Sequence, residues 1–214
     1  MPEYSTPPAG LRVRRAMSTD FEAIADIHCA ALPQDLLPRL GRRALAKVFY
    51  PWFLNTELFD FIALAGDDTL AGFIVLRNRT PTLREVLPIC VKLLPFLVWN
   101  CLVHPSVAFV CACYLLSRRH ETVEGRAVVC SAQKEIVVVA VAAGWRRNGI
   151  GSKLITAAIS RMSGSDVMLV KTDSETARSF YLMQGFAVVG HERRCRRSLY
   201  MLARPVQLRP AGEA

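Results

Sequence analysis

Residues 137–155, VVVAVAAGWRRNGIGSKLI, carry the strongest structural signal in this chain. An apolar run rich in valine meets a basic turn with two glycines, and the apolar periodicity of a helix follows at once. β-Branched residues favour strands, whereas apolar residues three and four positions apart favour a helix. The stretch therefore predicts a strand, a tight turn and a helix that begins at about residues 148–150.

The turn between this strand and this helix has the chemistry of an anion site. Backbone N–H groups in the first turn of a helix lack partners within the helix, and the helix dipole is positive there. Gly149 and Gly151 lack a Cβ and allow close approach, Ser152 adds a hydroxyl donor, and Arg146 and Arg147 add positive charge. Together they suit a pyrophosphate. A basic surface loop that ends in a glycine cap is the alternative. The nucleotide motifs GxxxxGK[ST] and GxGxxG are both absent.

Length and composition indicate one folded domain. The chain has 214 residues, of which 52% are hydrophobic and 21% charged, enough to bury a sizeable core. Its formal net charge of +9 favours anionic partners such as phosphates or an anionic membrane surface. Nucleic acid is the least supported partner, since the basic residues are not interleaved with aromatic ones and no helix-turn-helix pattern stands out.

The cysteines indicate a reducing compartment. There are seven, an odd number with irregular spacing, which predicts free thiols and a cytoplasmic protein. Cys111 and Cys113 form a CxC, but no second pair completes a zinc set, so we expect no metal site.

Four elements are predicted before residue 79. Residues 11–17 alternate like a strand, and residues 18–32 suit a helix capped by Ser18 or Thr19. A second, interrupted helix is expected over residues 36–55, with a bend or stop at Pro51. Two apolar runs flank a turn and predict an antiparallel hairpin covered on both faces, residues 59–66 and 69–78.

Residues 79–128 are unusual. Within them, residues 93–116 contain no Asp, Glu, Lys or Arg, while Arg84 and Lys92 lie on one side of this run and Arg118 and Arg119 on the other. We expect two helices, about 84–101 and 106–119, broken near Pro105. An apolar lid or packing insertion, a membrane-surface element and a true membrane span all remain open. The strands expected on both sides belong to one domain, which argues against the span.

The remaining sequence predicts alternating strands and helices. After the strand at 135–143 come a helix over 150–163, a strand over 166–172, a helix over 174–184 and two final strands. This order predicts an α/β domain around a mixed sheet. We expect a disordered lead at 1–10, a single domain at 11–204 with an insertion at 79–128, and a flexible tail at 205–214.

Two motifs resemble the GCN5-related N-acetyltransferase (GNAT) superfamily. Residues 146–151 match its R-x-x-G-x-G motif. Residues 174–186, SETARSFYLMQGF, resemble its N-x-x-A-x-x-F-Y-x-x-x-G-F element, with Ser174 in the place of the asparagine. The resemblance covers about residues 11–204, and the long apolar insertion before the central strand is similar to that of a bacterial branch.

The resemblance implies an α/β (α+β) fold with a mixed, mostly antiparallel sheet of six to seven strands flanked by helices. It also implies acetyl-CoA as cosubstrate, with the pyrophosphate held at the glycine turn and the pantetheine arm held by backbone hydrogen bonds. The strands around residues 141 and 170 would splay to admit the thioester. The cofactor-binding residues it implies are Val139, Ala140, Val141, Arg146, Arg147, Asn148, Gly149, Ile150, Gly151, Ser152, Ser174, Ala177 and Tyr181.

Two residues are candidates for catalysis. Aminolysis of a thioester needs a base that takes a proton from the ammonium and an acid that protonates the leaving thiolate. Glu135 occupies the place where many members of the resembled family carry a glutamate base, although a solvated strand-end glutamate is the alternative. Tyr181 is the candidate acid, and a core tyrosine is the alternative.

The expected activity is acetyl transfer from acetyl-CoA to a primary amine of a small molecule, such as an amino sugar, directly in a ternary complex. A longer-chain acyltransferase and a non-catalytic CoA-binding or membrane-docked scaffold are the alternatives. Acceptor contacts are expected from residues 33–42 and from the insertion. Residues 84–119 could contact a membrane peripherally, at the inner face for a cytoplasmic protein, and a strand near the C-terminus leaves a homodimer open.

Overall fold

The computed structural model describes residues 11–33, 35–66, 69–103, 120–121, 132, 134–162, 166–194 and 197–205. Its described strands form one mixed sheet in the order β1-β2-β3-β5-β6-β8-β7-β4. The expected mixed, mostly antiparallel sheet is confirmed, because only β5 and β6 pair in parallel. The eighth strand, β4 (His120–Glu121), has only two residues, pairs with β7, and was not predicted.

The first half of the sheet begins with β1 (Arg12–Arg15) and the hairpin of β2 (Phe59–Ala65) and β3 (Leu70–Arg77). Along β2, alternate side chains enter two separate cores: Phe59, Phe61 and Ala63 enter one, and Ile62 and Leu64 the other. The expectation that the hairpin is covered on both faces is therefore confirmed.

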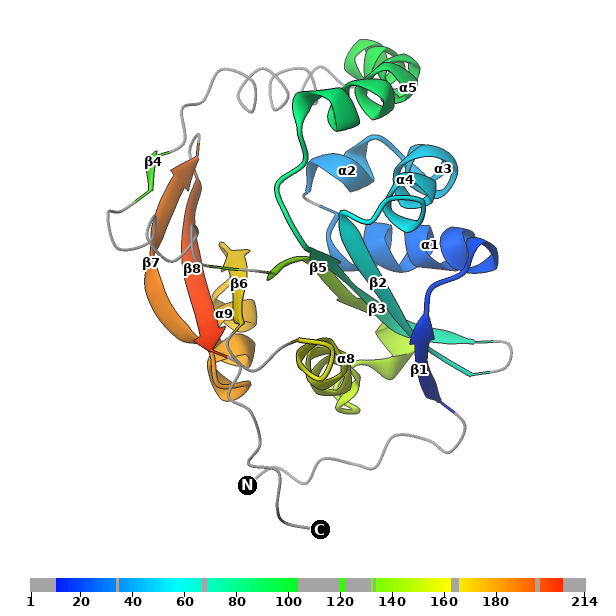
Figure 1. The fold of residues 1–214 in the computed structure, drawn as a ribbon. Coiled ribbons are helices and arrows are strands. Elements are labelled where there is room, and N and C mark those ends of the chain that lie inside the picture. The colour runs from blue at the N-terminus through cyan, green and yellow to red at the C-terminus, as the bar shows by residue number, and fades with distance from the viewer. Residues whose placement is uncertain are drawn as a thin grey trace.

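Helices before the hairpin cover one face of the sheet (Figure 1). These are the 3-10 turn η1 (Ser18–Asp20), α1 (Phe21–Ala31), α2 (Leu36–Arg39), α3 (Arg42–Ala44), the π-helix η2 (Leu45–Phe49) and α4 (Tyr50–Leu54). The first core lies between them and the sheet, and it is rich in aromatic side chains from α4, β2 and β3.

Two expectations about these helices were wrong. Neither Ser18 nor Thr19 caps the first helix; instead the Asp20 carboxylate accepts the Met17 N–H at 2.7 Å and is held by Arg14. Pro51 does not stop the second helix, because the helix continues from η2 through Pro51 to Leu54. The interruption lies earlier, between α2 and α3, where Gly41 has a φ of 93°.

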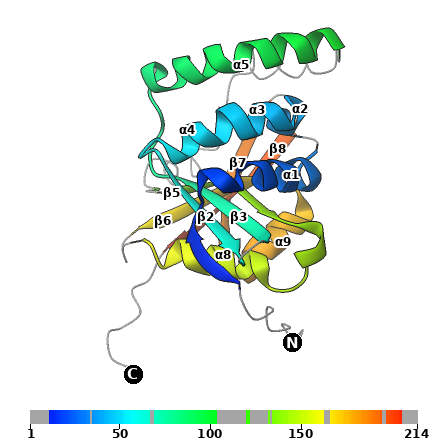
Figure 2. The ribbon, with the colours of Figure 1, turned by 90° about the vertical axis from the view of Figure 1, so that its right-hand side faces the viewer.

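Part of the 79–128 insertion forms the helix α5 (Leu83–Val103), which contains Pro88 and Pro95. It lies outermost in the molecule, beyond α2 and α4 (Figure 2). The predicted first helix of the insertion is confirmed, whereas the helix expected at 106–119 falls outside the described residues.

The second half of the sheet follows the glycine turn. It contains β5 (Lys134–Val141), the 3-10 turn η3 (Ala143–Trp145), α8 (Ile150–Ile159), β6 (Val167–Thr172), α9 (Glu175–Met183), β7 (Ala187–Arg194) and β8 (Arg197–Pro205). The second core forms on the face that α8 and α9 cover. The expected elements are confirmed, although α8 ends four residues earlier than the predicted residue 163.

Candidate active site

The parallel strands β5 and β6 diverge. Their pairing consists of Lys134 with Met168, Glu135 with Leu169 and Ile136 with Val170, and it ends there although both strands continue. The expected splay is thus present, and it separates the two halves of the sheet in Figure 1. Beyond Ile136, the edge of β5 that faces β6 has backbone groups that the sheet does not pair.

A β-bulge marks the start of the divergence. Val75 pairs with Val138 and Leu76 pairs with Ile136, so Val137 is an extra residue without an opposite partner on β3. Such bulges re-aim a strand and increase its local twist. The bulge therefore turns β5 where its pairing to β6 stops.

Backbone polarity along β5 follows from its register with β3. The Ala142 N–H donates to the Ala71 carbonyl at 2.9 Å, so alternate residues Ala140 and Ala142 point their polar groups toward β3. Val139 and Val141 consequently direct theirs toward the open edge. Of the three residues expected to bind the pantetheine arm, Ala140 is thus ruled out as a backbone contact, because its backbone is engaged with β3.

The turn before α8 has an unusual backbone. Gly149 is the N-cap of α8 with φ of 70°, and Arg147 also adopts a positive φ, of 69°. This left-handed conformation is uncommon for a residue with a side chain, and such strain gathers at functional sites. The N-cap Gly149 has no side chain to cap α8, and the helix hydrogen bonds begin with the Lys153 N–H to the Gly149 carbonyl. The N–H groups that precede Lys153 in this turn are the ones that a helix leaves without an internal partner.

Side chains around this turn differ in how far they are exposed to a ligand. Arg146 and Arg147 are exposed, and the Arg146 Nε donates to the Val141 carbonyl at 3.3 Å, on the open edge of β5. Asn148 and Ser152 are partly exposed. The Ile150 side chain is buried in the second core, so this residue can offer a ligand only its backbone N–H.

The second motif packs directly on the first. A Cβ on Gly151 would lie only 3.2 Å from the Phe180 Cζ, so this glycine lets α9 approach the first turn of α8. Gly185, with φ of 81°, follows the end of α9, and its N–H donates to the Leu182 carbonyl at 3.0 Å. Two motifs about 30 residues apart therefore meet at one place.

Ser174 has a structural role in this arrangement. It is the N-cap of α9, and its Oγ accepts the Ala177 N–H at 3.2 Å. The expectation that the hydroxyl caps the helix is confirmed.

Tyr181 lies on the α8–α9 face of the sheet. It is buried in the second core, with its ring edge-on to Phe180 and to Phe186 at 5.3 and 5.4 Å between centroids. Burial raises the pKa of the Tyr181 phenol above its ordinary value. The hydroxyl is therefore a neutral hydrogen-bond donor, and full proton transfer to a thiolate is less favourable than from an exposed phenol.

Glu135 lies on the opposite face of the sheet. It is opposite Arg77 of β3 in the register and forms an ion pair with the Arg77 guanidinium, with 19% of the Glu135 side chain exposed. The pair stands where β5 and β6 begin to diverge. A group placed between the diverging strands would thus have Glu135 on one face and Tyr181 on the other.

The sequence did not reveal Arg77 or Gly72 as site residues. Arg77 acquires its partner only through strand pairing. Gly72 adjoins the open part of β5, and a Cβ there would lie 2.8 Å from the Ala140 carbonyl and 3.3 Å from side-chain atoms of Ile150 and Leu154. An isolated glycine inside an apolar strand is the signal that could have found it.

The regions expected to contact an acceptor are brought together. The Asn100 Nδ2 of α5 donates to the Leu40 carbonyl at 3.2 Å, which joins the insertion to the 33–42 segment. Nearby on α1, burial raises the pKa of Cys29, the reverse of what an activated nucleophile requires. Among the described residues, no group of three or more His, Cys, Asp or Glu could hold a metal; Cys111 and Cys113 lie outside them.

A family model described as the acetyltransferase (GNAT) domain matches residues 109–188, which include the glycine turn and all of α9. Residues 109–188 are thus similar to a GNAT acetyltransferase domain. Solved structures show a similar fold. The histone acetyltransferase HPA2 and related acetyltransferase from Corynebacterium glutamicum has a TM-score of 0.59 at 16% identity, with 94% of this chain and 99% of that chain covered.

Two further structures with the GNAT fold were solved with a cofactor. An aminoglycoside 6'-N-acetyltransferase complexed with coenzyme A has a TM-score of 0.59 at 13% identity, with 93% of this chain and 99% of that chain covered. The protein yncA of Salmonella typhimurium, with its cofactor acetyl-CoA, has a TM-score of 0.56 at 15% identity, with coverage of 96% and 99%. At such identities the likeness shows the fold. A search of curated proteins found no match.

Proposed function

We propose that this protein transfers an acetyl group from acetyl-CoA to a primary amine of a small molecule, such as an amino sugar. The observation that carries the proposal is the divergence of β5 and β6 directly before the uncapped N-terminus of α8. The divergence leaves alternate backbone groups of β5 that the sheet does not pair, and the start of α8 offers an anion site. A linear ligand with a pyrophosphate at one end fits both.

The residues of the turn would hold the pyrophosphate. First-turn N–H groups of α8 supply hydrogen bonds, and the exposed Arg146 and Arg147 supply charge. Val139 and Val141 would bind the pantetheine amides through the open edge of β5, as a sheet edge binds an added strand. Coenzyme A is the group found in similarly folded structures, including the aminoglycoside 6'-N-acetyltransferase.

Glu135 would take a proton from the acceptor ammonium, directly or through water. The neutral amine nitrogen then attacks the thioester carbonyl, a C–N bond forms, and the C–S bond breaks. Tyr181 would donate a hydrogen bond to the leaving sulfur. The attacking nitrogen loses its second proton as the C–S bond breaks, and a proton passed through the Tyr181 hydroxyl or water completes the CoA thiol. The proton that Glu135 took is released to solvent. No covalent enzyme intermediate is needed.

Calorimetric titration with acetyl-CoA, free CoA and longer acyl-CoAs tests the proposal. We compare wild type with Gly149→Glu, which places a carboxylate at the anion site, and with Thr156→Glu, which adds the same charge on the exposed middle of α8. We expect acetyl-CoA to bind wild type and Thr156→Glu alike, and Gly149→Glu to bind at least about tenfold more weakly, or ~1.4 kcal/mol.

Two results would change the proposal. Folded wild-type protein that binds no CoA species would overturn it. Preference for a long acyl chain would make the protein a longer-chain acyltransferase. Initial rates of thiol release with amino sugars, amino acids and peptide N-termini then identify the acceptor class, and no turnover with any amine despite CoA binding would indicate a non-catalytic CoA-binding protein.

The cytoplasm is our proposed location. Cys29, Cys90 and Cys101 are free thiols among the described residues, as in a reducing compartment. Mass spectrometry of protein alkylated in the cell of origin would test this, with all seven cysteines alkylated as the expected result.

A further inference from the structure

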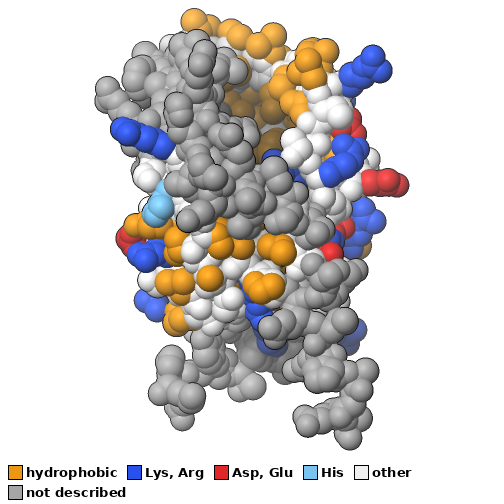
Figure 3. All heavy atoms as spheres, turned by 60° about the vertical axis from the view of Figure 1, so that its left-hand side comes forward, with side chains coloured by type: hydrophobic (Ala, Val, Ile, Leu, Met, Phe, Trp, Pro, Cys, Tyr) orange, Lys and Arg blue, Asp and Glu red, His pale blue; other side chains and the backbone are white. Residues whose placement is uncertain are grey.

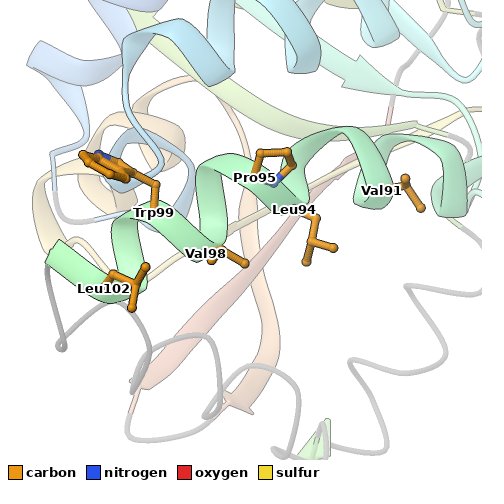
Figure 4. A pocket seen from close by; sticks show the side chains of 6 residues that line it. All are labelled: Val91, Leu94, Pro95, Val98, Trp99 and Leu102. Carbon is orange, nitrogen blue, oxygen red and sulfur yellow. The ribbon is translucent and has the colours of Figure 1, made fainter.

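Helix α5 carries an exposed stripe of apolar side chains. They recur every three or four residues, so they share one side of the helix. Between 50% and 79% of each side chain is exposed, and the members of this apolar stripe are Leu83, Leu87, Val91, Leu94, Val98 and Leu102. A shallow groove of about 370 Å³ runs along it. Figure 4 shows the side chains that line this groove, which include Pro95 and Trp99.

The opposite side of α5 is attached to the domain. Ile89 is buried, Phe96 and Leu97 are partly buried, and the Asn100 side chain bonds the Leu40 carbonyl. This attachment fixes which side of the helix faces outward. The apolar stripe therefore lies on the outer surface of the molecule, where Figure 2 shows α5 beyond the other helices and Figure 3 shows hydrophobic side chains gathered at the top.

The charges on α5 favour an anionic partner. Arg84 and Lys92 are exposed on this helix, and its one acidic residue, Glu85, is paired with Arg79. The chain as a whole has a formal net charge of +9. Trp99, with 68% of its side chain exposed, is of the type that gathers at membrane–water interfaces. An anionic lipid surface offers apolar depth and negative headgroups together.

Length alone would also allow α5 to cross a membrane. Its segment Leu83–Leu102 has a mean hydropathy of 1.6 and is 6% buried, and 21 residues of helix extend about 32 Å. However, a helix that crosses a bilayer would have to break the packing of Ile89 and the Asn100–Leu40 hydrogen bond. An orientation parallel to the surface keeps these contacts.

We propose that α5 docks this protein on an anionic membrane surface, with the helix in the plane of the bilayer and the apolar stripe at the boundary between headgroups and acyl chains. Arg84 and Lys92 would contact lipid phosphates, a contribution of the kind that basic residues make near anionic leaflets. This inference does not rest on the proposed acetyl transfer.

Co-sedimentation with lipid vesicles tests the docking. Wild type is mixed with vesicles of phosphatidylcholine alone and of phosphatidylcholine with phosphatidylglycerol, at low and high salt. We expect binding to the anionic vesicles that weakens with salt. Leu94→Glu in the stripe should reduce it at least about tenfold, whereas Met183→Glu, at another exposed apolar side chain on α9, should not. Circular dichroism confirms that both variants are folded.

Cys90 provides a second readout, because it is exposed on α5. Anionic vesicles should slow its reaction with maleimide, as read by mass spectrometry of the labelled peptide.

Three outcomes would overturn the docking. Folded wild type could fail to bind anionic vesicles, and slow Cys90 labelling without lipid would then indicate that another part of the chain covers the stripe. Binding could be the same in Leu94→Glu. Sedimentation velocity could show a dimer that Leu94→Glu dissociates, which would make a second copy the partner.

Discussion

Arg77 holds Glu135 at the start of the β5–β6 divergence. The contribution of the Glu135 carboxylate to catalysis can be measured with a single substitution. Glu135→Gln keeps the shape and a hydrogen-bonding group but cannot accept the ammonium proton. We expect kcat to fall about a hundredfold or more, with the Kd for acetyl-CoA little changed. Steady-state rates and calorimetry on the same preparation give both quantities.

Asp60→Asn is the matched control for this change. Asp60 forms an ion pair with Lys134, one residue from Glu135 and on the other face of the sheet. Asp60→Asn removes one negative charge near the same end of β5 and leaves the proposed base Glu135 unchanged. Equal kcat values for wild type and Glu135→Gln would exclude Glu135 as the base.

Gly72 is a position where one methyl group should matter. A Cβ would approach the Ala140 carbonyl at 2.8 Å, and a backbone atom cannot move aside as a side chain does. We expect Gly72→Ala to lower the free energy of unfolding by about 1–3 kcal/mol through overpacking. Urea denaturation measures this, and Gly144→Ala, with no atom within 4 Å of the added Cβ, should change it by less than ~0.5 kcal/mol.

At the scale of the element, α9 depends on its cap. Ser174→Ala removes the acceptor of the Ala177 N–H and should cost about 1 kcal/mol of unfolding free energy, whereas Ser174→Asn should retain most of it. Thermal or urea unfolding provides the measurement. Ser179→Ala, at an exposed position inside the same helix, is the control and should be neutral or slightly stabilising. Equal losses in the two alanine variants would show that the cap contributes nothing.

At the scale of the molecule, the described residues form one sheet between two cores, and the first core contains a titratable pair. His28 of α1 is buried, and its Nδ1 lies 2.5 Å from the Tyr50 hydroxyl of α4. Burial lowers the pKa of His28 to about 4, because a charged imidazole would lose its hydration there. Burial likewise raises the pKa of Tyr50.

The stability of the fold should therefore decline in mild acid. In the unfolded chain His28 takes up a proton near pH 6.5, whereas in the folded protein it does so only near pH 4. The unfolded state is favoured as pH falls between these values, by up to ~1.4 kcal/mol per pH unit and on the order of 3 kcal/mol in total. Urea unfolding at several pH values measures the slope.

His28→Gln should reduce the dependence of the unfolding free energy on pH, even if the variant is less stable than wild type. His191→Gln, at an exposed histidine of β7, should leave it as in wild type. A wild-type free energy of unfolding that stays constant between pH 6.5 and pH 4 would contradict the prediction.

Local signals were enough for the elements and for the turn. Val137–Val141 read as a strand, Gly149 as a helix start and Ser174 as a cap, because strand propensity, positive φ and capping depend on residues near in the sequence. The two motifs also allowed the fold and the site to be expected before any contact was known. The expectations at Pro51 and Ser18 were wrong, because the helix runs through Pro51 and breaks at Gly41 instead, and because Asp20 is held by Arg14 and accepts the Met17 N–H.

Tertiary structure decided what the sequence left open. The register with β3 directs the backbone polar groups of Val139 and Val141 toward the open edge of β5 and those of Ala140 toward β3. The same register places Arg77 beside Glu135. Packing of α9 on α8 places Phe180 against Gly151. Packing of α5 on the domain leaves its apolar stripe exposed to solvent. Each of these depends on residues far apart in the chain, so their physical cause is strand pairing and burial, which no single stretch of sequence contains.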